Sequence, residues 1–105
     1  VSSERVFVEN IRGSVAGYRG DWKLAREHYE KALDFALRTR ASDHPDVLET
    51  AMFLAESDLA LGEPKVVPAR LAVIDKVLAA QPNPFGSSKR ALIEARHWLA
   101  LGELA

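Results

Sequence analysis

Hydrophobic residues recur at helical spacing along most of this chain. In the clearest segment they follow one another at steps of three and four residues: Trp22, Ala25, Tyr29, Ala32, Leu33 and Ala36. Charged residues fill the positions between them, which is typical of an amphipathic helix with one buried face. The pattern predicts a helix from residue 22 to about residue 40. No segment shows the alternation that a half-buried strand requires.

Four more helices are expected around this one. Their predicted ranges are about 3–18, 45–61 and 66–80, with a last helix that ends at Gly102. Pro45 suits the first turn of its helix. Pro68 would clash with the carbonyl four residues back, so the fourth helix should start late or with a distorted first turn. Residues 81–86 are rich in helix breakers, and Ser87 or Ser88 is expected to cap the last helix.

Three similar turns divide the chain. The letters LALGE occur at residues 59–63 and again at 99–103, and YRGDW occupies residues 18–22. The glycines of these turns, Gly20, Gly62 and Gly102, lie at intervals of 42 and 40 residues (62 − 20 and 102 − 62). A glycine behind an apolar-periodic segment indicates a left-handed helix stop, and the acidic residue that follows suits a new helix start. Each turn is therefore interpreted as a joint between two helices.

The residues around these joints resemble the tetratricopeptide repeat. The first unit matches its small, turn and packing positions in order through Gly13, Gly20, Trp22, Ala25, Tyr29 and Ala32. The second matches through Leu54, Ala55 and Gly62, and the third through Ala95, Trp98 and Gly102. The spacing near 42 resembles the longer variant found in kinesin light chains and in many bacterial signalling proteins.

This resemblance implies an all-α fold, a right-handed superhelical stack of antiparallel helix pairs. We expect an α-solenoid of five helices in one domain over residues 1–105: repeat 1 about 3–41, repeat 2 about 43–81 and a partial repeat 3 about 86–105. The chain begins with Val1 in place of an initiator methionine, so we expect it to be a fragment of a longer protein.

Small residues within the helices would let the helix axes approach closely. Those expected to do so are Gly13, Ala25, Ala32, Ala55 and Ala95. Gly17 has no such cause, and it should weaken the first helix by about 1 kcal/mol relative to alanine.

Composition narrows the possible functions. The net charge is −1, so no strong field gathers nucleic acid or an anionic membrane surface. The longest apolar runs are a few residues, far below the roughly 20 of a membrane helix. Cysteine is absent, which excludes disulfides and thiol chemistry and fits a cytoplasmic location. We expect neither nucleic acid nor membrane as a partner.

Candidate catalytic and metal-binding motifs are incomplete. Glu94 and His97 have the spacing of di-iron bundle proteins, but such sites need two such pairs, so a surface pair is predicted. The glycines of residues 13–20 lack the preceding strand and the Gly-Lys-Ser/Thr ending of a phosphate loop. His44 precedes Pro45 at a helix entrance and is expected to cap it or to lie in a solvated turn. We therefore predict no enzymatic activity, no cofactor and no metal.

In the tetratricopeptide repeat family the first helix of each pair lines a concave groove, and the resemblance implies the same arrangement here. The groove candidates are Asn10, Ser14, Tyr18, Met52, Glu56, Lys89, Leu92 and Arg96. The resemblance implies a non-catalytic scaffold that binds a protein, as a peptide or helix, in this groove. The alternative is a regulatory or sensor segment of a larger bacterial signalling protein, a serine/threonine kinase or a transcription regulator, whose activity lies outside this chain.

The last helix has no second helix behind it, so its outer flank should be apolar and exposed. Trp98, Leu101 and Leu104 are expected there, and self-association through this helix is predicted.

Overall fold

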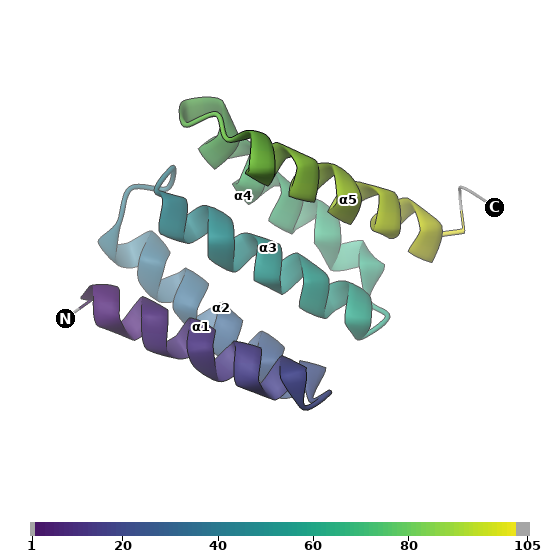
Figure 1. Cartoon of the computed structure of the whole chain (residues 1–105), viewed down its shortest axis with the longest axis horizontal. Coiled ribbons are helices and arrows are strands. Elements are labelled where there is room, and N and C mark those ends of the chain that lie inside the picture. Colours follow the sequence, from purple (N-terminus) through teal and green to yellow (C-terminus); the bar gives the residue numbers. More distant parts are fainter. Residues whose placement is uncertain (1, 103–105) are drawn as a thin grey trace.

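Five helices form two layers. The computed structural model describes residues 2–102, whose helices are α1 (Ser2–Tyr18), α2 (Trp22–Thr39), α3 (Pro45–Ala60), α4 (Val67–Ala80) and α5 (Pro84–Ala100). A short 3-10 turn, η1 (Pro64–Val66), precedes α4. Figure 1 shows α1, α3 and α5 side by side in front of α2 and α4. No strand occurs in this range, so the predicted all-α helical repeat is confirmed.

The three glycine corners adopt the predicted left-handed conformation. The φ angles of Gly20, Gly62 and Gly102 are 82°, 71° and 77°. At the first corner the amide of Asp21 donates to the Ala16 carbonyl at 2.9 Å, and at the second the amide of Glu63 donates to the Asp58 carbonyl at 2.9 Å. These bonds satisfy carbonyls that a helix end leaves open. Side chains other than glycine are strained at such φ angles, which explains why the corners share this residue.

The helix starts correct one prediction and support two others. Asn83 caps α5 by accepting a hydrogen bond from the Gly86 amide at 3.1 Å, so the expected cap at Ser87 or Ser88 is wrong. Pro84 suits the first turn, and α5 therefore begins inside the supposed breaker segment. His44 caps α3, its Nδ1 accepting from the Asp46 amide at 3.0 Å. The delayed start of α4 is also observed.

Helices α1 and α2 pack by placing glycines against aromatic rings. A Cβ on Gly13 would lie 2.5 Å from Cε1 of Tyr29, and one on Gly17 would lie 3.0 Å from Cζ3 of Trp22. The packing of Trp22 accounts for Gly17, which the sequence left unexplained. Tyr29 also stacks on Phe53 of α3 with 5.1 Å between ring centroids.

Helices α3 and α4 pack through branched aliphatic side chains. Leu54, Val67 and Ile74 have no exposed surface, and Val77 is almost as deeply buried. Together with Ile93 of α5 they belong to one hydrophobic cluster that also includes the residues between α1 and α2. The chain therefore has a continuous core that runs along the stack.

Helix α5 packs on α3 and α4 with a different face from the one expected. Its buried residues are Gly86, Ile93 and His97, whereas Ala95 is exposed. The predicted packing role of Ala95 is therefore wrong, because that face of α5 points away from α3 and α4. The predicted surface pair is also wrong for His97, which is only 5% exposed.

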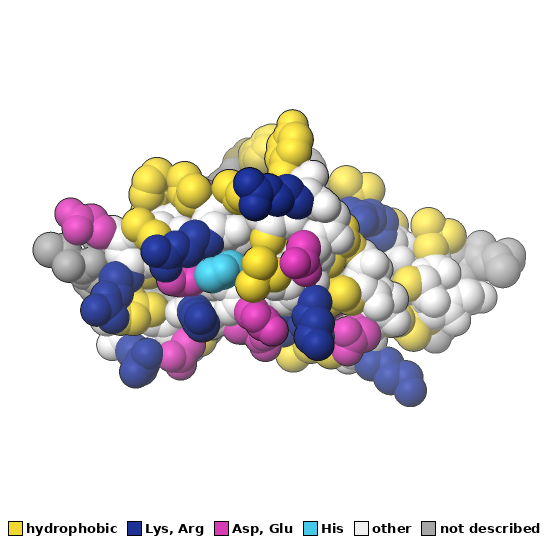
Figure 2. Space-filling model, turned by 90° about the horizontal axis from the view of Figure 1, so that it is seen from below, with side chains coloured by type: hydrophobic (Ala, Val, Ile, Leu, Met, Phe, Trp, Pro, Cys, Tyr) yellow, Lys and Arg dark blue, Asp and Glu magenta, His cyan; other side chains and the backbone are white. Residues whose placement is uncertain are grey.

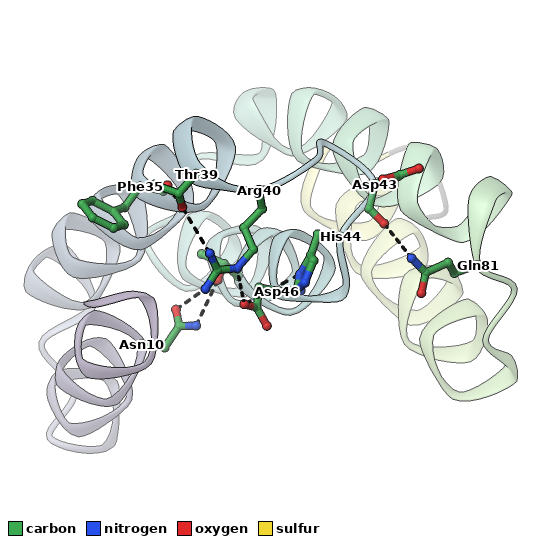
Figure 3. A network of polar contacts seen from close by, with 9 residues as sticks. Asn10, Phe35, Thr39, Arg40, Asp43, His44, Asp46 and Gln81 are labelled. Carbon is green, nitrogen blue, oxygen red and sulfur yellow. Dashed lines mark hydrogen bonds and ion pairs between the residues drawn. The ribbon is translucent and has the colours of Figure 1, made fainter. Parts of the chain in front are cut away.

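Polar contacts join successive helices along the stack. Figure 3 shows Arg40, just after α2, beside Asp46 of α3, and the link from Gln81 to the backbone of Asp43. Arg40 Nε donates to Asp46 Oδ2 at 2.9 Å, and Gln81 Nε2 donates to the Asp43 carbonyl at 3.3 Å. These bonds hold the loop between α2 and α3 in place, and thereby the joint between the two helix pairs.

Candidate binding surface

The layer formed by α1, α3 and α5 is the inner side of an arch. In Figure 3 the helices follow a curve, with α2 and α4 on its outside and α1, α3 and α5 on its inside. Figure 2 shows one end of the stack, where hydrophobic side chains gather along the upper edge and charges of both signs interleave below. The upper edge is the side that faces the viewer in Figure 1. Uncovered hydrophobic surface therefore gathers on the inner side.

A hollow of about 440 Å³ lies between α1 and α3, and we call it the apolar hollow. Phe7, Ile11 and Tyr18 line it from α1 and are 65%, 48% and 97% exposed. Contiguous uncovered hydrophobic surface of this kind marks interaction sites in monomeric proteins. Polar groups frame the hollow, and its other lining residues are Asn10, Ser14, Val15, Arg19, Glu49 and Phe53.

Helix α1 carries two apolar stripes, and only one of them is covered. Val6, Gly13 and Ala16 are buried. Phe7 and Ile11, four residues apart, form the second stripe with Val15 and Tyr18. Sequence analysis missed Phe7 and Ile11 as groove residues. The signal that was present is the second stripe itself, which the pairing with α2 does not require.

Asn10 is largely used by the fold. It is 8% exposed, and its Nδ2 donates to Oγ1 of Thr50 at 3.0 Å. The Thr50 hydroxyl donates back to Oδ1 of Asn10 at 3.2 Å. Figure 3 shows the Asn10 side chain directed toward α3. This buried pair fixes the position of α1 on α3 and leaves the amide little capacity for a ligand.

A second hollow, of about 410 Å³, lies beside the first. Four aromatic residues line it, so we call it the aromatic hollow; its lining is Tyr18, Trp22, Tyr29, Phe53, Ser14, Gly17 and Glu56. The hydroxyls of Ser14 and Tyr29 lie 3.0 Å apart and share a hydrogen bond. Burial raises the pKa of Tyr29, the bond to Ser14 lowers it, and the charge of Glu56 adds a further rise, with a net increase.

Two candidates from different helices meet across the inner face. Nζ of Lys89 on α5 lies 3.4 Å from Oε1 of Glu56 on α3, and the two side chains are 34% and 29% exposed. Oε1 of Glu56 is buried and has no hydrogen-bond partner. Arg96 and Leu92 are exposed at helical spacing from Lys89, and Leu92 keeps 56% of its surface uncovered.

Met52 differs from the other candidates. It is 9% exposed and belongs to the hydrophobic core cluster. Its neighbour Phe53, which was not among the candidates, lines both hollows. The side of α3 that faces the groove is thus marked by Glu49, Phe53 and Glu56.

The flank of α5 carries exposed hydrophobic residues. Trp98, Leu99 and Leu101 are 39%, 60% and 37% exposed, and Leu104 lies outside the described residues. Self-association through this flank stays a prediction, which sedimentation equilibrium would test.

The described residues contain neither a metal-binding cluster nor a membrane-spanning helix. Within residues 2–102 no cluster of three or more His, Cys, Asp or Glu side chains is placed to hold a metal ion. None of the helices in that range is both long and apolar enough to cross a membrane. Two histidines have other partners: His44 caps α3, and Nδ1 of His28 lies 2.7 Å from Oε2 of Glu9.

The two-layer stack with an open inner side defines a helical repeat protein. The tetratricopeptide repeat family model matches residues 5–66, a range that covers nearly all of α1, the whole of α2 and α3, and the turn η1. The chain belongs to the tetratricopeptide repeat family. No curated protein and no solved structure matches it significantly. Repeats of this family generally mediate protein–protein interactions and are typically non-catalytic.

Proposed function

We propose that this chain is a non-catalytic interaction scaffold that binds a peptide or a helix of another protein across α1, α3 and α5. The apolar hollow is the observation that carries the proposal. Exposed hydrophobic side chains of α1 line it, together with the polar residues Glu49, Arg19 and Ser14. Such a surface gives a partner apolar contact in the centre and polar contacts that fix its register.

The energetics of the two apolar contacts suit a weak affinity. Burying one leucine or phenylalanine side chain stabilises a complex by about 1.5–3 kcal/mol. Two such anchors contribute about 3–6 kcal/mol before the cost of ordering an extended peptide is subtracted, so they alone give a Kd on the order of 0.1 mM or weaker. Binding of this strength is typical of reversible recognition.

The proposal extends to the finer class of the chain. The corner spacings of 42 and 40 residues support assignment to the longer, kinesin-light-chain-like variant (62 − 20 and 102 − 62). If the chain is a regulatory segment of a larger signalling protein, the same inner face would bind either a partner or another segment of that protein.

Selection of peptides from a random library displayed on phage would test the groove. Phe7→Glu places a charge in the apolar hollow, at a side chain that is 65% exposed and contributes little to folding. Phe85→Glu is the matched control, because Phe85 is 74% exposed and lies outside both hollows. The selected peptides should lose at least about tenfold in affinity for the first variant and keep their affinity for the second.

Equal binding of the selected peptides to both variants would show that the apolar hollow does not bind them. Weaker binding to Phe85→Glu alone would place the contact on α5 instead.

A further inference from the structure

The aromatic hollow combines features that neither the fold nor the apolar hollow requires. Tyr18, Trp22, Tyr29 and Phe53 contribute rings, and Glu56 contributes a carboxylate. The rings come from three different elements, namely α1, α2 and α3. A purely structural cluster would close over its rings, whereas Tyr18 here is 97% exposed and the hollow is open.

Glycine contributes to the opening of this hollow. A Cβ on Gly17 would meet the Trp22 ring at 3.0 Å, so the missing side chain leaves room above that ring. Tyr29 and Phe53, which also line the hollow, are stacked with 5.1 Å between ring centroids. The Tyr29 hydroxyl is engaged by Ser14 at 3.0 Å, which fixes the ring in place. The part of the lining formed by Tyr29 and Phe53 is therefore held in position before any ligand arrives.

Aromatic faces carry partial negative charge and attract cations, most strongly where a carboxylate is nearby and water is partly excluded. Glu56 supplies that carboxylate. Its Oε1 is buried without a hydrogen bond, although Nζ of Lys89 lies 3.4 Å away. The contact with Lys89 is thus an ion pair without a hydrogen bond, and it offsets only part of the charge of the carboxylate. Glu49, at the edge of the adjoining apolar hollow, adds a second negative charge.

We propose that the aromatic hollow receives a cationic side chain, lysine or arginine, of the segment bound in the groove. This inference rests on the proposed function and specifies its ligand: a hydrophobic residue occupies the apolar hollow and a basic residue occupies the aromatic hollow beside it. The two hollows share Ser14, Tyr18 and Phe53, so residues close together in one peptide can reach both.

The same charges disfavour an acidic or phosphorylated residue at this position. Such a group would face Glu56 and the ring faces, which repel anions. Lys89 and Arg96 belong to α5; Nζ of Lys89 reaches Oε1 of Glu56 at 3.4 Å, but the lining of the aromatic hollow comes from α1, α2 and α3. Acidic residues of a partner are expected to point toward α5 instead.

A pair of synthetic peptides tests this inference. The probe is acetyl-Leu-Ala-Arg-Ala-Leu-amide, and its control contains citrulline, the neutral isostere of arginine. Binding is followed by NMR on the 15N-labelled chain through the indole N–H signal of Trp22 and the amide signals of Phe7 and Ile11. The arginine peptide should bind about tenfold more tightly and should shift the Trp22 signal. Glu56→Gln should abolish the preference for arginine, and the matched variant Glu49→Gln should retain most of it.

Each other outcome is decisive. If both peptides bind equally and shift only the signals of Phe7 and Ile11, the inference of a cation site is wrong, and the proposed peptide groove is supported. If the preference for arginine persists in Glu56→Gln, the cation binds elsewhere and the inference is also wrong. If neither peptide shifts any inner-face signal at up to about 10 mM, both this inference and the proposed groove fail for peptides of this kind. Unchanged thermal unfolding of the two variants confirms that the comparison concerns binding.

Discussion

The two complete helix pairs, α1 with α2 and α3 with α4, pack through different kinds of side chain. Between α1 and α2 the contact consists of glycines against large rings, with Gly13 under Tyr29 and Gly17 beside Trp22. Between α3 and α4 it consists of branched aliphatic side chains, including the fully buried Leu54 and Ile74. The first arrangement brings the helix backbones together and leaves ring edges uncovered. The second fills the space between its helices with aliphatic side chains.

This difference explains why the candidate binding surface lies at one end of the stack. The aromatic hollow includes Gly17 and Trp22 of the first pair, and the apolar hollow is lined mainly by α1. The second pair contributes through Phe53, Glu49 and Glu56, which project from α3 toward the first pair. A repeat packed through glycine and aromatic residues thus supplies both stability and an open surface. A repeat packed through aliphatic residues supplies mainly stability.

The largest expected effect comes from emptying the second pair. Ile74→Ala removes a fully buried side chain from α4 and leaves a cavity, because tightly packed neighbours relax only partly. The free energy of unfolding should fall by about 2–5 kcal/mol. Urea denaturation followed by circular dichroism measures this change. Leu24→Ala on α2, at a side chain that is 41% exposed, is the control and should change the unfolding free energy by about 0.5 kcal/mol or less.

A smaller effect is expected at the ionic junction between the pairs. Asp58 of α3 has no exposed surface; its Oδ2 accepts from Arg70 Nε at 3.0 Å, and its Oδ1 lies 3.5 Å from Arg26 Nη1. Asp58→Asn keeps the shape and removes the charge. The loss should be about 1–3 kcal/mol, less than for fully buried pairs, because both arginines retain some exposure to water.

Glu63 provides the matched control for this junction. It also pairs with Arg26, at 2.8 Å, but is 49% exposed. Glu63→Gln should cost less than about 1 kcal/mol. Equal losses for the two variants in urea denaturation would show that burial of Asp58 does not determine the strength of the junction.

Most of the fold was predictable from the sequence because its determinants are local. A glycine at each corner, followed by an acidic residue, marks the helix boundaries through backbone conformation alone. Helical periodicity then identified the buried side of α2. The start of α5 was not predictable in the same way, because Asn83, Ser87 and Ser88 are all good caps. The choice depends on Gly86 being buried, which is a property of the packed structure.

The site was less predictable because exposure depends on which neighbours are present. Phe7 and Ile11 resemble core residues in sequence, and only the arrangement of α1 against α2 and α3 leaves them uncovered. Met52 and Phe53 are adjacent in sequence and point about 100° apart on the helix, so the orientation of α3 decides which of them faces the groove. Family phasing favoured Met52 as a groove residue, whereas the structure buries it and places Phe53 in both hollows.

Two alanine variants of α1 test the glycine-against-aromatic contact directly. Both gain roughly 1 kcal/mol of helix propensity. At Gly13 the new Cβ would lie 2.5 Å from a buried ring that is stacked and hydrogen-bonded, so Gly13→Ala should be destabilised by a net ~1 kcal/mol. At Gly17 the Trp22 ring is half-buried and able to shift, so Gly17→Ala should be neutral or stabilised. Thermal unfolding of the two variants side by side measures the difference. The reverse order would show that Tyr29 is not held as rigidly as its contacts indicate.

The smallest expected effect is a dependence on pH inside the first pair. Glu9 of α1 lies 2.7 Å from His28 of α2 and 2.9 Å from Arg12. Burial alone would raise the pKa of Glu9, but the hydrogen bonds and charges of His28 and Arg12 outweigh it, so its pKa lies below the ordinary 4.5. At pH values near 4.5, Glu9 is therefore protonated less often in the folded chain than in the unfolded chain. Its contribution to stability is complete above pH 4.5 and is lost as the pH falls through the folded-state pKa.

Glu9→Gln removes this contribution, so the difference in unfolding free energy between the two proteins should narrow as the pH falls from about 5.5 to about 3.5. The change should amount to a few tenths of a kcal/mol, because the pair lies near the surface. In a His28→Gln background, this difference in unfolding free energy should change less with pH, because the hydrogen bond with His28 contributes most to the lowering of the pKa of Glu9. A difference that stays constant with pH, measured by urea denaturation, would mean that Glu9 and His28 do not connect the two helices in solution. The first pair would then lack this ionic link, which would widen the contrast with the second pair, where a buried carboxylate joins three helices.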